Sequence, residues 1–335
     1  MNPIFSKAKD VAKARFERSL KEVEAQKQQT FVPSPFSVQT IGDKNIDFSI
    51  IFSTSNGVFI LDPKNGIQQQ ILEGKYYGIT KQHSLWFFSR SNNQGDRDHT
   101  KNDRISDIST AKITNDQVED YRLKLFGIPG EVHQIDIFED QLIFPHSGYN
   151  QILSMETAAL LKAEQPLWFD AYRSIPLSIK APSHLNSIYI NKEKIYLIAH
   201  NYTMRTGRLS DLIVYDKNTS DVQIKALKAH SAHNICVLQG DLYYCDSNNK
   251  KLFKNETVYF EGDKLLRGLS INDKYIFVGG SDICFDNYKR FSNSPSIYLL
   301  DRFTGKHIST FILPDLGDLY EIRQFKAIDY AMSTH

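Results

Sequence analysis

His133-Gln-Ile-Asp-Ile-Phe-Glu-Asp-Gln-Leu-Ile-Phe-Pro-His146 contains two short alternating strands joined by a tight polar turn, with a histidine at each end. The same arrangement returns three times along the chain, in copies that begin at His184, His233 and Arg267. A strand-pair unit that repeats in this way predicts a radial or stacked architecture. Because three consecutive copies open with histidine, a toroidal fold would gather three imidazoles in one place.

A second repeated element follows these hairpins. Its copies, residues 59–66, 213–220 and 299–305, each contain a strand that ends in Asp and a turn that passes through Asn or Thr to Gly or Ser. Asp accepts hydrogen bonds from the backbone that follows it, and Gly tolerates a positive φ, so this spacing predicts another hairpin. Two successive hairpins form a four-stranded antiparallel meander, which is the blade of a β-propeller.

The number of blades follows from the starts of the innermost strands. These are predicted near Tyr77, His133, His184, His233, Arg267 and Tyr320. The last of them begins a blade that the remaining residues cannot complete, whereas residues 47–72 contain outer strands without an opening strand. Pairing these two segments closes the ring and removes exposed sheet edges. We therefore predict an all-β fold, a closed six-bladed β-propeller over residues 31–335, with seven blades as the alternative.

Residues 1–30 differ from the rest of the chain and predict an N-terminal amphipathic α-helix. From Ser6 to Gln29 there is no Gly or Pro, and apolar residues recur at helical spacing from Phe5 to Val23. Acidic residues are interspersed with the basic ones and the apolar stripe contains no Trp, unlike helices that lie on membranes. We expect this helical extension to dock on the propeller or to pair with a second copy, giving a homo-oligomer.

Composition and charge limit the classes of function. The 335 residues include 40 basic and 39 acidic side chains, a net charge of +1, so the basic surplus typical of nucleic-acid-binding proteins is missing. Three cysteines, an odd number in a long chain, favour a reducing compartment over a disulfide framework. No apolar run is long enough to cross a membrane, and the first residues lack the apolar core of a signal peptide. We expect a cytoplasmic protein without nucleic-acid partners or membrane insertion.

The candidate site lies at one mouth of the central channel, where inner strands begin, second strands end and the loops after them emerge. The candidate catalytic residues open inner strands: His133, His184, His233, Arg267 and Glu321. The candidate ligand-binding residues are Tyr77, which opens an inner strand, and His146, His200, Asn201 and Asp246, which close second strands. The longest loops, residues 91–116, 202–211 and 281–295, are predicted at the same face, and function concentrates on such loops.

Histidines clustered beside Arg and a carboxylate indicate acid–base or metal chemistry. Near neutral pH an imidazole binds a divalent cation or transfers protons, and Arg holds an anionic group in its forked guanidinium. Crowding beside Arg267 is expected to lower the pKa of each imidazole, because each positive charge disfavours the next. The neutral rings would then be available as metal ligands or as bases.

The histidine-tagged inner strands and the propeller pattern of residues 31–335 resemble the superfamily of six- and seven-bladed propellers with a histidine-lined mouth. Oligogalacturonate lyase and virginiamycin B lyase are enzymes of that kind. The resemblance implies a divalent metal ion near the axis and a His or Arg that acts on a proton next to a carboxylate. It makes His133, His184 and His233 metal ligands or bases. Arg267 would bind the carboxylate, and Glu321 would ligate the metal or orient an imidazole.

These features lead to two functions of different classes. The first is an enzyme of the lyase, cyclase or hydrolase type that acts on a small polar or anionic molecule through these histidines, with or without a metal. The alternative is a non-catalytic propeller that binds a protein or a glycan through its loop-rich face. Convergent imidazoles favour the enzyme, and scattered ones favour the binding module. A four-histidine iron oxygenase would need a further axial ligand from His83, His146 or His200.

Overall fold

The computed structural model describes residues 34–43, 46–91, 105–147, 150–169, 173–177, 183–283 and 289–333, together with Glu17 and Lys21. The predicted helix at residues 1–30 lies almost wholly outside this part of the chain, as do residues 92–104 of the predicted loop, so both stay predictions. Within the described residues, runs rich in Val, Ile, Tyr and Phe form short strands that stop at Asn, Asp and Gly turns.

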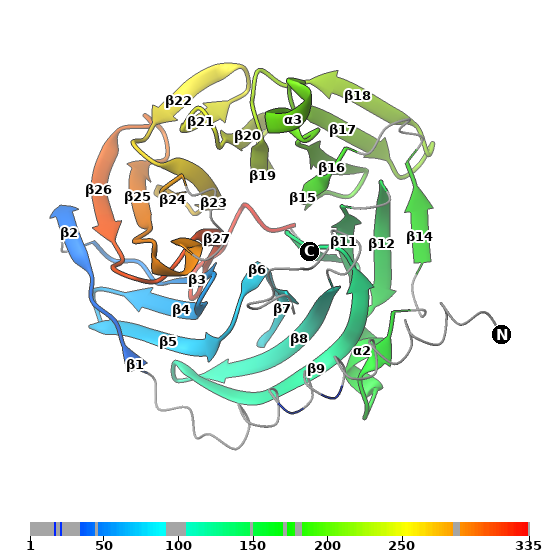
Figure 1. Ribbon diagram of the computed structural model, residues 1–335, viewed down its shortest axis with the longest axis horizontal. Coiled ribbons are helices and arrows are strands. Elements are labelled where there is room, and N and C mark those ends of the chain that lie inside the picture. The colour runs from blue at the N-terminus through cyan, green and yellow to red at the C-terminus, as the bar shows by residue number, and fades with distance from the viewer. Residues whose placement is uncertain are drawn as a thin grey trace.

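The strands form six sheets around a central axis, like the blades of a propeller (Figure 1). From the axis outward, the first two blades are β27 (Leu319–Gln324), β3 (Ile50–Thr54), β4 (Gly57–Asp62) and β5 (Ile67–Glu73), then β6 (Tyr76–Gln82), β7 (Leu85–Ser91), β8 (Ile105–Thr114) and β9 (Gln117–Pro129). The third and fourth are β10 (Asp136–Phe138), β11 (Gln141–His146), β12 (Gln151–Glu156) and β14 (Arg173–Pro176), then β15 (Leu185–Ile190), β16 (Lys194–Ala199), β17 (Asp211–Asp216) and β18 (Val222–Ala226). The last two are β19 (Ala232–Leu238), β20 (Asp241–Asp246), β21 (Lys251–Lys254) and β22 (Thr257–Glu261), then β23 (Leu265–Ile271), β24 (Tyr275–Ser281), β25 (Ser296–Asp301) and β26 (His307–Ile312).

The prediction of a six-bladed all-β propeller is confirmed. Three short strands extend outer edges: β1 (Ser34–Pro35) on β5, β2 (Gln39–Gly42) on β26, and β13 (Leu167–Trp168) on β9. The helices α2 (Thr157–Lys162), α3 (Thr203–Thr206) and the 3-10 helix η2 (Lys289–Ser292) are all short. In the part of the chain that the structure describes, no helix has the length and apolar character needed to span a bilayer.

Strand β8 begins at Ile105, so the loop predicted over residues 91–116 extends too far. Its pairs with β7 run from Ser106 opposite Ser91 to Lys112 opposite Leu85. Most of this strand is buried although it is rich in Ser and Thr, which hid it in the sequence. The Ser106 hydroxyl donates to the carbonyl of Gly130 at 3.0 Å and accepts from the backbone N–H of Val132 at 3.0 Å. Buried hydroxyls with partners of this kind carry little cost, so a polar segment can form an interior strand.

Strand β27 closes the ring by pairing with β3, from Leu319 opposite Thr54 to Gln324 opposite Ile50. Its apolar side chains, among them Ile322, pack in one cluster with Phe52 of the first blade and with residues of the last blade. Each large apolar side chain buried in this way contributes roughly 1.5–3 kcal/mol. The closure therefore joins the first blade to the last and covers the edge of β3 that would otherwise be unpaired.

The residues that follow β27 cross the end of the channel opposite to the strand starts. Asp329, Tyr330 and Ser333 form hydrogen bonds with one side chain or backbone group in each of four blades: Ser270, Cys236, Ile190 and Asp136. In Figure 1 the C-terminus lies near the centre of the ring. Residues 329–333 thus cover the far end of the channel, which makes the mouth at the strand starts the candidate place for a ligand.

Candidate functional site

The pairing register breaks at the mouth end of five inner strands. The breaks lie between Tyr76 and Ile79, Leu185 and Ser187, His233 and Ile235, Leu266 and Leu269, and Leu319 and Glu321. Such a bulge sets two residues against one on the partner strand and re-aims their side chains. Two successive residues, such as His233 and Asn234, therefore both face the axis. Asn234 has a φ of 51°, in the left-handed region that Asn adopts more readily than most residues.

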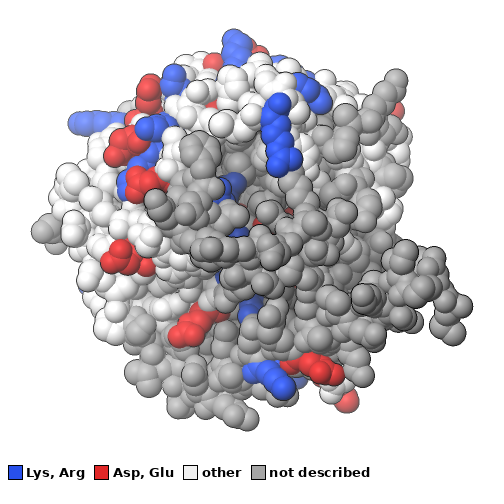
Figure 2. Space-filling model, in the orientation of Figure 1, with Lys and Arg blue, Asp and Glu red and all other residues white. Residues whose placement is uncertain are grey.

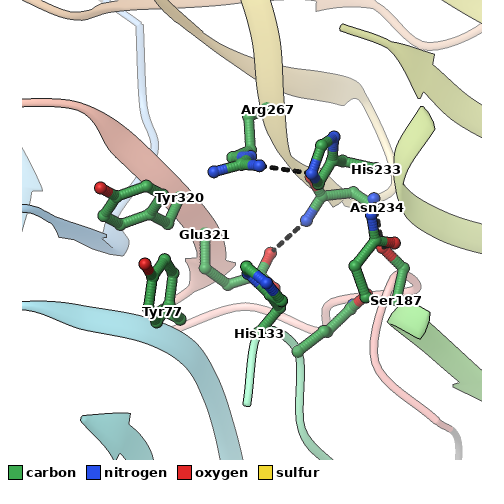
Figure 3. A pocket seen from close by; sticks show the side chains of 10 residues that line it. Tyr77, His133, Ser187, His233, Asn234, Arg267, Tyr320 and Glu321 are labelled. Atoms are coloured by element: carbon green, nitrogen blue, oxygen red, sulfur yellow. Dashed lines mark hydrogen bonds between the residues drawn. The ribbon is translucent and has the colours of Figure 1, made fainter. Parts of the chain in front are cut away.

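The outer layer of the mouth is a ring with one residue from each blade: Tyr320, Tyr77, His133, His184, His233 and Arg267. Adjacent ring centroids are 4.5 Å apart for Tyr320 and Tyr77 and 4.7 Å for Tyr77 and His133. The Arg267 guanidinium lies 5.3 Å from the Tyr320 ring and completes the circle (Figure 3). The structure brings the three tagged histidines and Arg267 together, and Tyr77 stands beside them.

A second layer of polar side chains forms the floor of a small hollow: Gln134, Asn186, Ser187, Asn234 and Glu321. Glu321 does not complete the outer ring as expected, because the bulge in β27 gives that position to Tyr320. The hollow has a volume of about 220 Å³, including the space at its opening to solvent. Sites for drug-sized ligands measure about 300–1,000 Å³. In this arrangement the hollow has room for a group the size of a water molecule. A larger ligand would require the side chains of the outer ring to move outward.

Hydrogen bonds from blade to blade hold the floor in place. The Gln134 side-chain oxygen accepts from the backbone N–H of Ile188 at 3.1 Å. The Ser187 hydroxyl accepts from the backbone N–H of Asn234 at 2.8 Å, and the Asn234 amide donates to Glu321 at 3.1 Å. These contacts connect four blades, so the polar side chains under the hollow are pre-positioned and not free to rotate.

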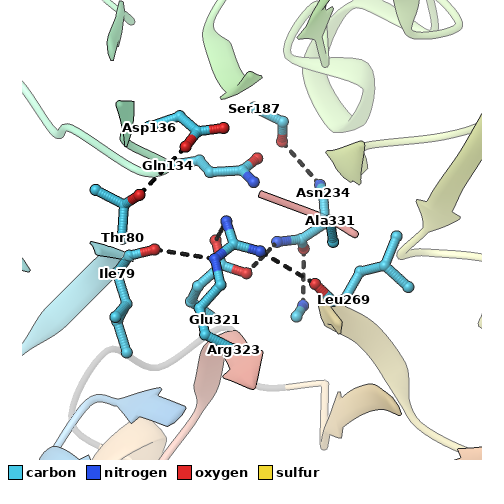
Figure 4. A network of polar contacts seen from close by, with 12 residues as sticks. Ile79, Thr80, Gln134, Asp136, Ser187, Asn234, Leu269, Glu321, Arg323 and Ala331 are labelled. Atoms are coloured by element: carbon cyan, nitrogen blue, oxygen red, sulfur yellow. Dashed lines mark hydrogen bonds and ion pairs between the residues drawn. The ribbon is translucent and has the colours of Figure 1, made fainter. Parts of the chain in front are cut away.

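Beneath the floor, Arg323 occupies the centre of the channel (Figure 4). Its guanidinium donates to the backbone carbonyls of Ile79 at 3.0 Å and Leu269 at 3.2 Å, and one nitrogen lies 3.3 Å from Glu321 Oε2. Both charged side chains are almost completely buried. Burial raises the pKa of Glu321 to about 8, although the charge of Arg323 acts in the opposite direction. Arg323 thus stabilises the charge of a carboxyl whose ionisation burial disfavours.

His233 uses both of its ring nitrogens inside the protein. Its Nδ1 lies 2.7 Å from the Ser231 carbonyl oxygen, which can only accept, so Nδ1 carries the proton. Its Nε2 is then an acceptor, and the Arg267 guanidinium donates to it. The pKa of His233 is well below its ordinary value, first because of burial and then because of Arg267. His233 thus orients Arg267, which differs from the expected role as a base or a metal ligand.

His133 and His184 form a direct imidazole pair, with their Nε2 atoms 3.1 Å apart. One nitrogen must donate and the other accept, so at least one ring is neutral. The pKa of His133 is lowered to about 3, mainly by burial; Glu131 opposes this shift and the charge of Arg267 adds to it. The expected direction of the shift is found, but burial contributes more than crowding of charges. His200 stands behind this pair, with its ring 4.2 Å from that of His184.

Positive charge surrounds the hollow, and Figure 2 shows Lys and Arg side chains at the centre of one hollowed face. Lys75 lies 3.9 Å from Glu131, and Arg290 lies 3.6 Å from Asp318. Arg267 has no acidic partner within ion-pair distance among the described residues, and its Nε atom is buried without a hydrogen bond. A desolvated guanidinium without a counter-charge is costly. An anion placed at Arg267 would offset this cost.

Of the five expected ligand-binding residues only Tyr77 lines the hollow; His146, His200, Asn201 and Asp246 do not. His146 is buried away from it, stacked on a neighbouring phenylalanine ring. The Asn201 side chain donates to Asp211 at 2.7 Å, and Asp246 accepts from the side chain of Asn249 at 2.8 Å. Asn and Asp at strand ends often stabilise the following turn in this way. The ends of the second strands lie farther from the axis than the starts of the inner strands, so their polar residues serve the loops.

The histidines, as arranged, do not fit a divalent metal ion. Across the residues whose placement is described, no group of three or more His, Cys, Asp or Glu could hold one. His233 is turned toward Arg267, whose fixed positive charge would repel a cation. His83, a candidate fourth histidine, is exposed in the turn between β6 and β7, at the other end of its blade.

The sequence also contained a sign of the polar floor, which is missed when every strand is assumed to alternate regularly. The residue that follows the tag is Gln134 in the third blade, Asn234 in the fifth and Glu321 in the first. In a regular strand, successive side chains point to opposite faces, so these residues would be placed away from the axis. The bulges turn them inward. The two successive polar residues at these three strand starts were thus the available sign of a two-layered site.

Acid sensitivity is expected to depend on His133. The unfolded chain binds a proton at this histidine near pH 6.5, whereas the folded protein does so at about 3, so lowering the pH between these values favours unfolding. Between pH 7 and pH 5, the wild type should lose up to about 2 kcal/mol more stability than His133→Gln, measured by urea denaturation. His307→Gln, at an exposed histidine, is the control. If the free energy of unfolding changed with pH in the same way in the wild type and in His133→Gln, the prediction would be wrong.

Known structures with a similar fold exist, although no protein-family model and no curated protein sequence matches the chain. A chain of the nidogen–laminin complex aligns with 84% of this chain and 99% of its own length, at 10% identity and a TM-score of 0.60. A periplasmic gluconolactonase of Pseudomonas aeruginosa aligns with 87% of this chain and 100% of its own, at 12% identity and a TM-score of 0.50. A putative 6-phosphogluconolactonase of Bacteroides fragilis aligns with 85% and 100%, at 11% identity and a TM-score of 0.47. At these identities the likeness shows the fold alone.

Proposed function

We propose that the protein is an enzyme that acts on a small carboxylic acid through proton transfer by the His133–His184 pair. The observation that carries the proposal is Arg267, a guanidinium at the mouth of the channel for which the described residues supply no acidic partner. Forked, charge-assisted hydrogen bonds to a carboxylate would satisfy it. His133 lines the same hollow as Arg267, and His184 contacts His133 from the neighbouring blade.

The bound acid would itself activate the base. Without a ligand, burial and Arg267 keep the pKa of His133 at about 3, too low for an effective base at neutral pH. A carboxylate at Arg267 would neutralise that charge and place a negative charge beside the ring, which raises the pKa of His133. His184 could then exchange a proton with His133 through their Nε2 contact. Elimination, cyclisation and hydrolysis all require a proton transfer of this kind.

The solved structures with a similar fold do not select between an enzyme and a binding module. Two of those named above are enzymes by name, the gluconolactonase and the putative lactonase, and one is part of a complex between two proteins. The choice therefore rests on the site. A non-catalytic propeller that binds a protein or a glycan through its loops has no need of a buried guanidinium, without an acidic partner among the described residues, next to a contacting imidazole pair.

Arg267→Gln is expected to weaken the binding of small carboxylates by about 10- to 100-fold, because charge-assisted hydrogen bonds contribute roughly 1.5–3 kcal/mol. Its melting temperature should be unchanged or higher, since the glutamine amide can still donate to His233 and a desolvated charge is removed. Binding would be measured by calorimetry and by ligand-induced thermal shift with acetate, propionate and lactate. Arg208→Gln, at an exposed arginine on the α3 loop, is the matched control.

The opposite pattern would contradict the proposal. A large drop in the melting temperature of Arg267→Gln, together with unchanged carboxylate binding, would make Arg267 structural. Carboxylate binding that depends on Arg267, without turnover of any acid in a screen by NMR, would favour the binding module.

A further inference from the structure

A buried donor in the floor of the hollow has no acceptor. Gln134 is 2% exposed, and its side-chain nitrogen makes no hydrogen bond, whereas its oxygen accepts from Ile188. An unsatisfied buried donor costs about 1–3 kcal/mol. The oxygen's bond to Ile188 fixes the orientation of the amide, so the nitrogen cannot turn away to find another partner. Gln134 lines the same hollow as Arg267.

We infer that the ligand is a short monocarboxylic acid with a hydroxyl or oxo oxygen beside its carboxylate. The inference rests on the proposed function and specifies its substrate class. Arg267 would hold the carboxylate at the mouth, and the Gln134 amide would donate to the second oxygen at the floor. Because the hollow is small, the two oxygen-bearing groups must be close together in the ligand.

The charges around the hollow select a single negative charge. The described side chains at the mouth include three cations, Lys75, Arg267 and Arg290, and two carboxylates, Glu131 and Asp318. Only Arg267 is left without an acidic partner. A second carboxylate on the ligand would also be directed toward Glu321 in the floor, where an added negative charge is disfavoured. A neutral oxygen at that position satisfies Gln134 without this repulsion.

In the free protein, a water molecule is the natural partner for the Gln134 nitrogen. The hollow has the size for one, and the surrounding floor is polar. Displacing such a water costs little only when the ligand replaces its hydrogen bonds. A plain fatty acid would displace the water without replacing them, whereas a hydroxy or oxo acid would replace them. The floor thus discriminates between acids that differ by one oxygen.

The test compares propionate, lactate, pyruvate and malonate by calorimetry. Lactate or pyruvate should bind the wild type about tenfold more tightly than propionate, the ratio expected for one added hydrogen bond. Malonate, the dianion, should bind most weakly. In Gln134→Glu, which keeps the acceptor for Ile188 but loses the amide donor, the preference over propionate should disappear. Gln223→Glu, at an exposed glutamine of β18, should keep the preference.

Equal binding of propionate and the oxygenated acids, or tighter binding of malonate, would overturn the inference. If the acids still bound in a manner that depends on Arg267, the proposed function would stand and only the substrate class would be wrong. If no acid bound in a manner that depends on Arg267, both the proposed function and the substrate class would be wrong. Should Gln134→Glu not fold, Gln134→Met replaces it, and the ranking of the four acids on the wild type decides on its own.

Discussion

His133→Gln is expected to lower turnover of the bound acid by about 10²–10⁴-fold, the usual contribution of a positioned general base, and His184→Gln should show a similar loss. Glutamine retains a polar group of similar size but does not take up a proton. Binding should change little, because Arg267 and its support by His233 are untouched. The measurement is kcat and KM for each variant, with the melting temperature recorded alongside.

His307→Gln serves as the control, because this exposed histidine lies on the outer strand β26. The pH profile adds a second readout: the rate of the wild type should fall as His133 becomes protonated in the complex, and this limb should vanish in His133→Gln. Full turnover combined with a melting temperature several degrees lower would show that the two histidines are structural and that the proposed chemistry is wrong.

Arg323→Leu should destabilise the protein by about 3–5 kcal/mol, because removing one partner of a buried ion pair leaves the other uncompensated. The variant also strands the carbonyl oxygens of Ile79 and Leu269, which Arg323 joins across the axis. Urea denaturation would measure the loss. Arg122→Leu is the matched control, since Arg122 is about half exposed in its ion pair with Asp120 and should change stability by less than about 1 kcal/mol.

A double variant tests the reason for this loss. If the cost comes from an uncompensated Glu321, then Arg323→Leu combined with Glu321→Leu should recover part of the stability. A double variant that is less stable than either single one, by the sum of the two losses, would show that Arg323 acts through its backbone contacts and not through Glu321.

The propeller could be read from the sequence because its signals are local. Each hairpin carries its own turn residues, such as the Asp that ends β17 and bonds to the backbone of Asn218 and Thr219. The incomplete final unit also predicted that the last strand would pair with the first blade. The boundaries of β8 were not predictable in this way, because its buried Ser and Thr side chains resemble those of a loop and their burial depends on tertiary packing.

The outer ring of the site was predictable from the sequence, and the polar floor beneath it was not. The position of His133, His184, His233 and Arg267 at strand starts was enough to place them around the axis. The separate roles of these residues were not predictable, because each role depends on the partner to which each ring nitrogen is hydrogen-bonded. The Ser231 carbonyl fixes the tautomer of His233. The spacing of residues in the sequence does not show which backbone carbonyl a histidine side chain will contact.

Strand β27 also sets the order of events when the chain is made. Tyr320 and Glu321 belong to β27, so the mouth of the channel has neither its sixth wall nor its carboxyl until this strand has been synthesised. Until then five blades and an unclosed first sheet must wait with free edges, a state that invites pairing with other chains. The same strand ends that state and completes the site, so a ligand that binds at the mouth would recognise only chains whose ring has closed. Such a ligand would favour closed over open chains by mass action, and would protect the newly made protein as well as the mature one.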